Sequence, residues 1–269
     1  MILRLFGAFL ILLHDLLAQN CSMVELCQKD VESDIPNPLD LMSRILEANK
    51  GISNILVEGD IALSKKRNAM KCRRGYCKWK KSYNGLVEIP YSISDYFYDS
   101  EKTRIENAME TFNKKTCIRF VPYTGQPDYL RIESELGCWS SVGRDGGPQV
   151  VSLFVYGCLD HGIIQHELLH SLGFYHEHNR SDRDKYVRIN WEMIPGVFAH
   201  NFAKEDTNNL NTPYDYSSVL HYGSTAFASV YGGTTITPIP DSSVPIGQTD
   251  EMSDIDILKI NRLYECGKY

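Results

Sequence analysis

The chain has 269 residues, enough for one domain of good size or two small ones, and its composition of 43% hydrophobic and 23% charged residues is ordinary for a folded protein. A formal net charge of -6 argues against a nucleic-acid partner, because nucleic-acid-binding domains are usually basic. Beyond the first residues, no segment approaches the roughly 18 consecutive apolar residues that a membrane-spanning helix needs. We therefore expect a soluble product that binds neither nucleic acid nor a membrane.

The N-terminus has the pattern of a secretory signal peptide. Arg4 precedes a short apolar run, 5–13, and Leu16-Leu17-Ala18 ends in a small residue that offers a site for signal peptidase. The run is too short to span a bilayer, and a buried N-terminal helix is the alternative. We expect residues 1–18 to be removed and the product to be secreted to the extracellular space, with storage in secretory granules as one route.

Residues 19–67 are polar, lack an obvious core pattern until 41–46, and end in the tribasic run Lys65-Lys66-Arg67. Such a run inside a secreted protein is an accessible cleavage site, although a solvated charge cluster has the same composition. We expect 19–67 to be an activation segment and 68–269 to be the catalytic domain.

After Asn68 the secondary-structure signals become clear. Apolar residues at i, i+3, i+4 and i+7 predict an amphipathic helix over 100–115, with Asp99 or Ser100 as its N-cap. A second helix is expected over about 160–172, and a third over 253–264. β-rich runs bounded by Gly, Pro or Asp predict strands at 85–93, 118–123, 129–133 and 149–153.

The chain contains eight cysteines, an even number, which behind a signal peptide indicates disulfide pairing. Zinc-ribbon chemistry is the alternative, but no C-x-x-C pair occurs and structural zinc sites favour such close pairs. The residues are Cys21, Cys27, Cys72, Cys77, Cys117, Cys138, Cys158 and Cys266.

The strongest chemical signal is a metal-ligand pattern. His166 and His170 lie four residues apart, so on a helix both imidazoles project from one face and can reach one ion. Gly173 can end that helix in the left-handed conformation, and the returning chain can bring His176 to the same ion. Three protein ligands leave a fourth position open, which is typical of a catalytic zinc.

Glu167 has the position of a general base. It follows a ligand but cannot point at the metal from the same helical face, so it can take a proton from water and return it to the leaving amine. A core helix that buries two histidines without a metal is the alternative, but both rings would then need other partners.

The stretch H-E-L-L-H-S-L-G-F-Y-H-E-H-N-R-S-D-R-D, 166–184, resembles the astacin signature of the metzincin zinc peptidases. The resemblance implies an α+β fold with a five-stranded mixed N-terminal sheet, two long helices, an active-site cleft and a mostly irregular C-terminal part that ends in one helix. Within this family, the extra Cys72 and Cys77 and the expected absence of an appended module make the chain most similar to the fish hatching enzymes (choriolysins). Nephrosin-like proteases are the nearby alternative.

The resemblance also implies roles around one Zn²⁺ per chain. Tyr222, in a segment that resembles the family's turn beneath the metal, would ligate the resting zinc and swing away to stabilise the transition state. Leu220 stands where family members usually have Met, and its similar volume predicts little loss. Gln149–Leu153 would be the edge strand along which an extended peptide substrate lies.

Two further roles concern activation. Val57-Glu58-Gly59-Asp60 resembles the family's F-x-G-D motif with Val57 in place of the aromatic residue, so Asp60 would fill the open zinc position in the precursor. A cut after Arg67 would free Asn68, whose ammonium would be received by Glu177.

The family's two disulfides imply that Cys117 pairs with Cys266 and Cys138 with Cys158. Cys72 is then left to pair with Cys77, and Cys21 with Cys27. From the residues alone, six mature cysteines allow fifteen pairings.

The predicted function is a monomeric zinc endopeptidase that acts on extracellular matrix-like protein, with egg-envelope glycoproteins as the favoured substrate. A catalytically dead binding homologue is the alternative from another class, but it would be expected to have lost a ligand or the base, and all are present. A zinc amidase fits the metal motif alone, and the peptide-binding strand and activation segment argue against it.

Overall fold

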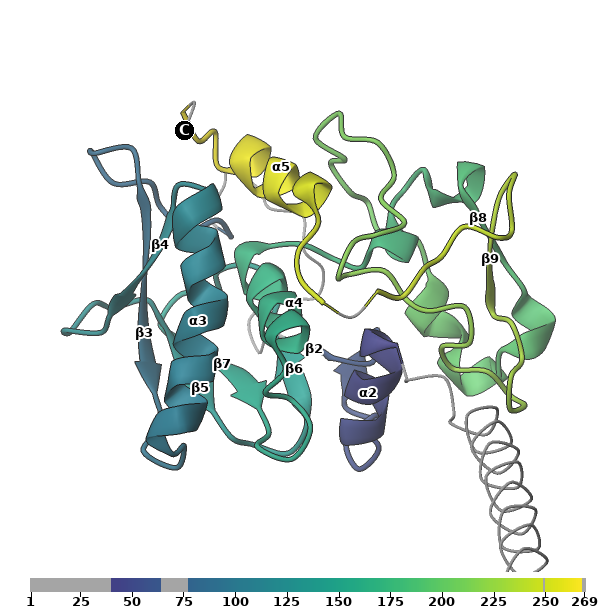
Figure 1. Ribbon diagram of the computed structural model, residues 1–269, viewed down its shortest axis with the longest axis horizontal. Helices are drawn as coiled ribbons and strands as arrows, with labels where there is room; N and C mark the ends of the chain where they lie inside the picture. The colour runs from purple at the N-terminus through teal and green to yellow at the C-terminus, as the bar shows by residue number, and fades with distance from the viewer. Residues whose placement is uncertain (1–39, 64–76, 249, 268–269) are drawn as a thin grey trace, which may run out of the picture. The chain divides into compact units, whose positions relative to one another are not determined.

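The computed structural model describes residues 40–63, 77–248 and 250–267 (Figure 1). The predicted signal peptide, the cleavage site Lys65-Lys66-Arg67, Asn68, and Cys21, Cys27 and Cys72 lie outside these ranges. Within them, no helix combines the length and the apolar composition needed to cross a membrane.

A mixed sheet forms one half of the molecule, with the strand order β1-β2-β6-β7-β5-β3-β4. Strands β3, β4, β5 and β7 are mutually parallel, whereas β6 runs antiparallel to β7. These five strands confirm the predicted five-stranded mixed sheet, and two strands from the N-terminal segment extend it past β6. Their bounds are β1 Leu56–Val57, β2 Ile61–Ala62, β3 Val87–Ile93, β4 Ile118–Pro122, β5 Tyr129–Glu133, β6 Cys138–Ser140 and β7 Pro148–Leu153.

Two long helices, α3 (Asp99–Lys115) and α4 (His161–Leu172), pack on each other and on the sheet (Figure 1). The predicted apolar stripe of α3 is buried as expected. Its N-cap, however, is Tyr98 rather than Asp99 or Ser100, and the Glu101 carboxylate accepts the Tyr98 backbone N–H at 2.8 Å. The helix starts one residue early because Glu101 then stands at the third helical position, where a carboxylate can reach back to the cap.

The C-terminal half is mostly irregular, as predicted. It contains short 3₁₀ turns, a two-stranded antiparallel pair of β8 (Val187–Ile189) and β9 (Ile236–Pro238), and the terminal helix α5 (Asp254–Leu263). Ser253 caps α5 by accepting the backbone N–H groups of Ile255 and Asp256. The pair β8–β9 and the helix α2 (Leu41–Ala48) were not predicted.

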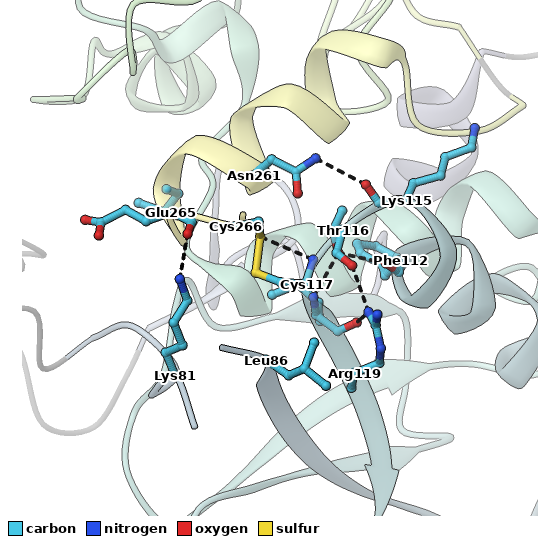
Figure 2. The surroundings of a disulfide bond; sticks show 12 residues. Lys81, Leu86, Phe112, Lys115, Thr116, Cys117, Arg119, Asn261, Glu265 and Cys266 are labelled. Carbon is cyan, nitrogen blue, oxygen red and sulfur yellow. Dashed lines mark hydrogen bonds between the residues drawn. A yellow bond between two sulfur atoms is a disulfide. The ribbon is translucent and has the colours of Figure 1, made fainter. Parts of the chain in front are cut away.

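Two predicted disulfides are present. Cys117 pairs with Cys266, which ties the end of α5 to the start of β4 (Figure 2), and Cys138 pairs with Cys158. Cys77 is also disulfide-bonded, but the Cys72–Cys77 pairing remains a prediction because Cys72 lies outside the described ranges.

Candidate metal centre

Three buried imidazoles converge beside α4. His166 and His170 lie one turn apart on this helix, and Gly173 ends it with a φ of 108°, a left-handed conformation that favours glycine. The chain then turns back and places His176 at the start of the 3₁₀ turn Glu177–Asn179. The ring centroids of His166 and His170, and of His170 and His176, are each 4.7 Å apart. The predicted three-histidine cluster therefore forms.

Asp60 completes this cluster from the N-terminal segment. Its Oδ2 atom lies 2.9 Å from His166 Nε2 and 3.2 Å from His176 Nε2, and its Oδ1 atom lies 3.5 Å from His170 Nε2. One ligand atom from each of the four residues lies within 4.8 Å of the others. Asp60 is fully buried, yet its Oδ1 atom has no hydrogen-bond partner within the described residues. Because buried polar atoms are normally satisfied, three imidazole nitrogens and this oxygen fit a tetrahedral zinc ion.

The outer nitrogen of each imidazole is also engaged. His166 Nδ1 donates to the Val219 carbonyl and His170 Nδ1 to the Phe174 carbonyl, each at 2.7 Å. Such bonds hold the tautomer in which Nε2 has a free lone pair facing the centre. His176 is different, because its Nδ1 donates to the Glu58 carboxylate at 2.8 Å, and Glu58 belongs to the same segment as Asp60.

Burial and neighbouring charges shift the pKa values of the two carboxylates at this site in opposite directions. Burial raises the pKa of Glu167 well above its ordinary value, and the charge of Asp60 adds to the rise. Burial also opposes ionisation of Asp60, but the three neighbouring histidines outweigh it and hold the Asp60 pKa well below its usual range. Both carboxylate oxygens of Glu167 lack hydrogen-bond partners in the part of the chain that the structure describes. The Glu167 carboxyl group can therefore accept a proton beside the three histidines.

Tyr222 is fully buried next to the cluster. Its ring lies 4.7 Å from that of His176 and 3.8 Å from that of His178, and its hydroxyl donates to the Glu58 carbonyl at 2.5 Å. The N-terminal segment therefore engages the Tyr222 hydroxyl here. Ligation of a resting metal by Tyr222 remains a prediction for the chain without that segment.

The structure corrects the prediction of which strand binds the substrate. Residues 149–153 belong to β7, which pairs with β5 on one side and with β6 on the other and so has no free edge. The two edges of the five-stranded sheet are β4 and β6, and β2 lies along β6 in parallel, with the Ser140 N–H donating to the Asp60 carbonyl at 3.1 Å. The prediction was wrong because β6 has only three residues, too few for an alternating pattern to appear.

Asn49 closes the same edge by another route. Its side-chain amide donates to the Cys138 carbonyl at 2.7 Å, and its Oδ1 accepts the Cys138 N–H at 2.7 Å, as a neighbouring strand would. The amide also donates to the Gly59 carbonyl at 2.8 Å. A Cβ atom at Gly137 would collide with Asn49 Oδ1, so only glycine admits this contact.

Glu177 is buried and fully paired. Its Oε2 atom lies 2.5 Å from Lys259 Nζ, and its Oε1 atom accepts from Arg180 Nη1 at 3.0 Å and from the Asp215 backbone N–H at 2.8 Å. It also lines a cavity of about 480 Å³ together with residues such as Tyr175. Sequence reasoning did not find Lys259, which comes from α5.

Leu220, the residue that replaces the usual Met, is buried and lines the same cavity. Its carbonyl accepts the Glu177 N–H at 3.0 Å, and its own N–H donates to the Ser218 hydroxyl. The turn that carries Tyr222 is therefore held by backbone hydrogen bonds that do not depend on a Met side chain.

The arrangement suits hydrolysis of an amide bond. Zinc held by three imidazoles supplies a Lewis acid that polarises a carbonyl and makes water more acidic. Glu167, with its free carboxylate, can accept a proton from water and pass it to the leaving nitrogen. The edge of β6 can hold an extended peptide through backbone hydrogen bonds.

Comparison with known proteins agrees with this chemistry. The family profile described as Astacin, a peptidase family, matches residues 74–265. The chain is 55% identical over 228 residues to high choriolytic enzyme 1 of Oryzias latipes (85% of this chain and 84% of the relative), and 54% identical over 229 residues to the low choriolytic enzyme of the same fish (84% and 84%).

Among solved structures, the chain resembles high choriolytic enzyme 1, a hatching enzyme zinc-protease from Oryzias latipes (medaka fish). The TM-score is 0.72 at 57% sequence identity, and the match covers 74% of this chain and all of that one. The chain therefore belongs to the astacin family of peptidases and is a zinc metalloendopeptidase similar to fish hatching enzymes.

Proposed function

We propose that this chain is the precursor of a secreted endopeptidase, with a signal peptide at 1–18, an activation segment at 19–67 and a catalytic domain at 68–269. The observation that carries the proposal is the position of Asp60 among three imidazoles, while the neighbouring Glu167 carboxylate has no hydrogen-bond partner within the described residues. A carboxylate in the fourth ligand position excludes the water that hydrolysis needs.

In the active enzyme His166, His170 and His176 hold the zinc, Glu167 is the general base, and Tyr222 donates to the oxyanion. The contacts of the activation segment support this assignment, because the segment contacts the three histidines and Tyr222 but makes no hydrogen bond to the Glu167 carboxylate. Asp60 faces the histidines, Glu58 accepts from the outer nitrogen of His176 and from Tyr222, and β2 covers the edge of β6.

Activation then couples two events. A cut after Arg67 lets the segment and Asp60 leave, and the new ammonium of Asn68 moves to Glu177. A charge-assisted contact of this kind is worth roughly 1.5 to 3 kcal/mol where it is partly buried. The buried carboxylate of Glu177 beside a cavity supports this role, with Lys259 and Arg180 as its partners before the cut.

Glu177→Gln tests the second event. We expect the variant to be cut normally but to leave its new N-terminus open to an aminopeptidase, whereas the parent resists. Equal resistance in the two proteins would contradict the role of Glu177.

The proposed natural substrate is an egg-envelope protein, because the similar proteins are named choriolytic enzymes and one is described as a hatching enzyme. A tissue protease of the nephrosin kind is the second candidate. Zinc-dependent digestion of purified egg envelope by the activated enzyme, beside a panel of ordinary matrix proteins, tests the choice. Faster digestion of the matrix proteins would favour the second candidate.

A further inference from the structure

Asp256, in the first turn of α5, does more than cap its own helix. It is 1% exposed, and its carboxylate receives three hydrogen bonds. The Ser253 backbone N–H donates to Oδ2 at 3.1 Å, which closes the capping box of α5. The other two bonds leave the helix, since the Ser218 hydroxyl donates to Oδ1 at 2.6 Å and the Val219 N–H donates to Oδ2 at 3.2 Å.

These two bonds lead to a zinc ligand. The Val219 carbonyl accepts His166 Nδ1–H at 2.7 Å. Val219 is therefore bound to Asp256 through its N–H and to His166 through its carbonyl. Ser218 adds a second restraint, because its hydroxyl oxygen accepts the Leu220 N–H at 3.1 Å. The orientation of the His166 imidazole thus depends on a turn whose position is set from α5.

The other end of α5 is anchored independently. The Cys117–Cys266 disulfide joins it to the start of β4, and Asn261 donates to the Lys115 carbonyl at 3.1 Å at the end of α3 (Figure 2). The Tyr264 hydroxyl donates at 2.8 Å to the carbonyl at the end of α4, the helix that carries His166. The helix that presents Asp256 is therefore fixed to the elements that hold the metal centre.

We propose that Asp256 is a positioning residue for the zinc ligand His166 and acts through the backbone of Val219. A residue that orients a ligand's outer nitrogen keeps its inner lone pair on the metal, and loss of such outer partners typically weakens metal binding or activity 10- to 100-fold. The inference rests on the role of His166 given under Proposed function. It does not depend on activation, because the same contacts are present with Asp60 in place.

The test is zinc affinity of the full chain, measured by competition with a chromogenic chelator. Asp256→Ala removes both acceptor oxygens, so the Val219 N–H and the Ser218 hydroxyl lose their partner on α5. We expect the zinc dissociation constant to rise about 10-fold, at the lower end of the range because the path runs through a backbone group. Asp254→Ala is the matched control, since Asp254 is exposed on the same helix and the variant loses the same charged side chain, and its zinc affinity should equal that of the parent.

Ser218→Ala provides a second, milder variant that decides the matter if Asp256→Ala does not fold. It should weaken zinc binding while the melting temperature of the zinc-free protein changes little. Zinc affinities of both variants within twofold of the parent would overturn the proposal and leave Asp256 as a structural brace. His166→Ala distinguishes failure of the positioning role from failure of the ligand assignment, because zinc binding equal to that of the parent would refute His166 as a ligand.

Discussion

Asn49 should contribute to inhibition of the precursor alongside the aspartate at the metal. Its side chain makes three buried hydrogen bonds, two with the backbone of Cys138 and one with the Gly59 carbonyl. Only the two bonds with Cys138 join the segment to the catalytic domain, because Gly59 belongs to the same segment as Asn49. At about 0.5 to 1.5 kcal/mol for each of these two bonds, Asn49→Ala should weaken docking of the segment by about 1 to 3 kcal/mol. That range corresponds to a roughly 5- to 150-fold increase in the fraction of undocked chain.

The assay is peptide hydrolysis by a precursor whose Lys65-Lys66-Arg67 site has been replaced so that it cannot be cut. Asp60→Ala alone should make this precursor leaky, which gives a measurable baseline, and adding Asn49→Ala should raise the rate by the factor above until the segment is mostly undocked. Asn54→Ala is the control, because Asn54 is exposed in the same segment.

A double variant no more active than Asp60→Ala would refute the reasoning about Asn49. An Asp60→Ala precursor as silent as its parent would show that the bulk of the segment, rather than a carboxylate on the metal, blocks the cleft.

Three further outcomes are expected. Glu167→Gln should keep zinc and the fold but lose about 100- to 10,000-fold in kcat, because the proton acceptor is gone, and near-parental peptide hydrolysis would exclude this role. Phenanthroline should abolish activity and added zinc should restore it, while serine-protease inhibitors have no effect; activity in zinc-free enzyme would exclude the mechanism. His221 is fully buried, and burial lowers its pKa from 6.5 to about 4. As the pH falls, the unfolded chain therefore binds a proton at His221 at a higher pH than the folded chain does. The stabilisation of the folded chain that depends on neutral His221 is fully present above about pH 6.5 and is lost as the pH falls to about 4. The loss is roughly 2 to 3 kcal/mol between about pH 7 and about pH 4.5. Urea unfolding of zinc-free parent and His221→Gln should show a flatter pH dependence in the variant, and parallel curves would contradict the assignment.

The metal centre could be predicted from the sequence because most of it is local. Four residues of helix bring His166 and His170 to one face whatever surrounds them, and a glycine at 173 permits the return that delivers His176. The predicted helices and the four long strands formed for the same reason, since their periodicities extend over five or more residues. Asp60 was predicted from the resemblance of residues 57–60 to the family's F-x-G-D motif.

The contacts that support the site could not be predicted in this way. β6 is three residues long, and β1 and β2 have two residues each, so none has a readable alternation. That β6 rather than β7 is an edge strand of the five-stranded sheet emerged only from the strand order. Asn49 joins Cys138 across 89 positions, and Glu58 joins His176 across 118.

Asp256 reaches the turn at Val219 in the same manner, across 37 positions. Each of these side chains is an ordinary polar residue whose neighbours in the sequence do not indicate its partner. Its partner is a backbone group or an imidazole nitrogen that folding brings close. Local pattern determined which residues can bind the metal, and only the tertiary structure decided which residues hold them in place, because a hydrogen bond between distant segments leaves no period in the chain.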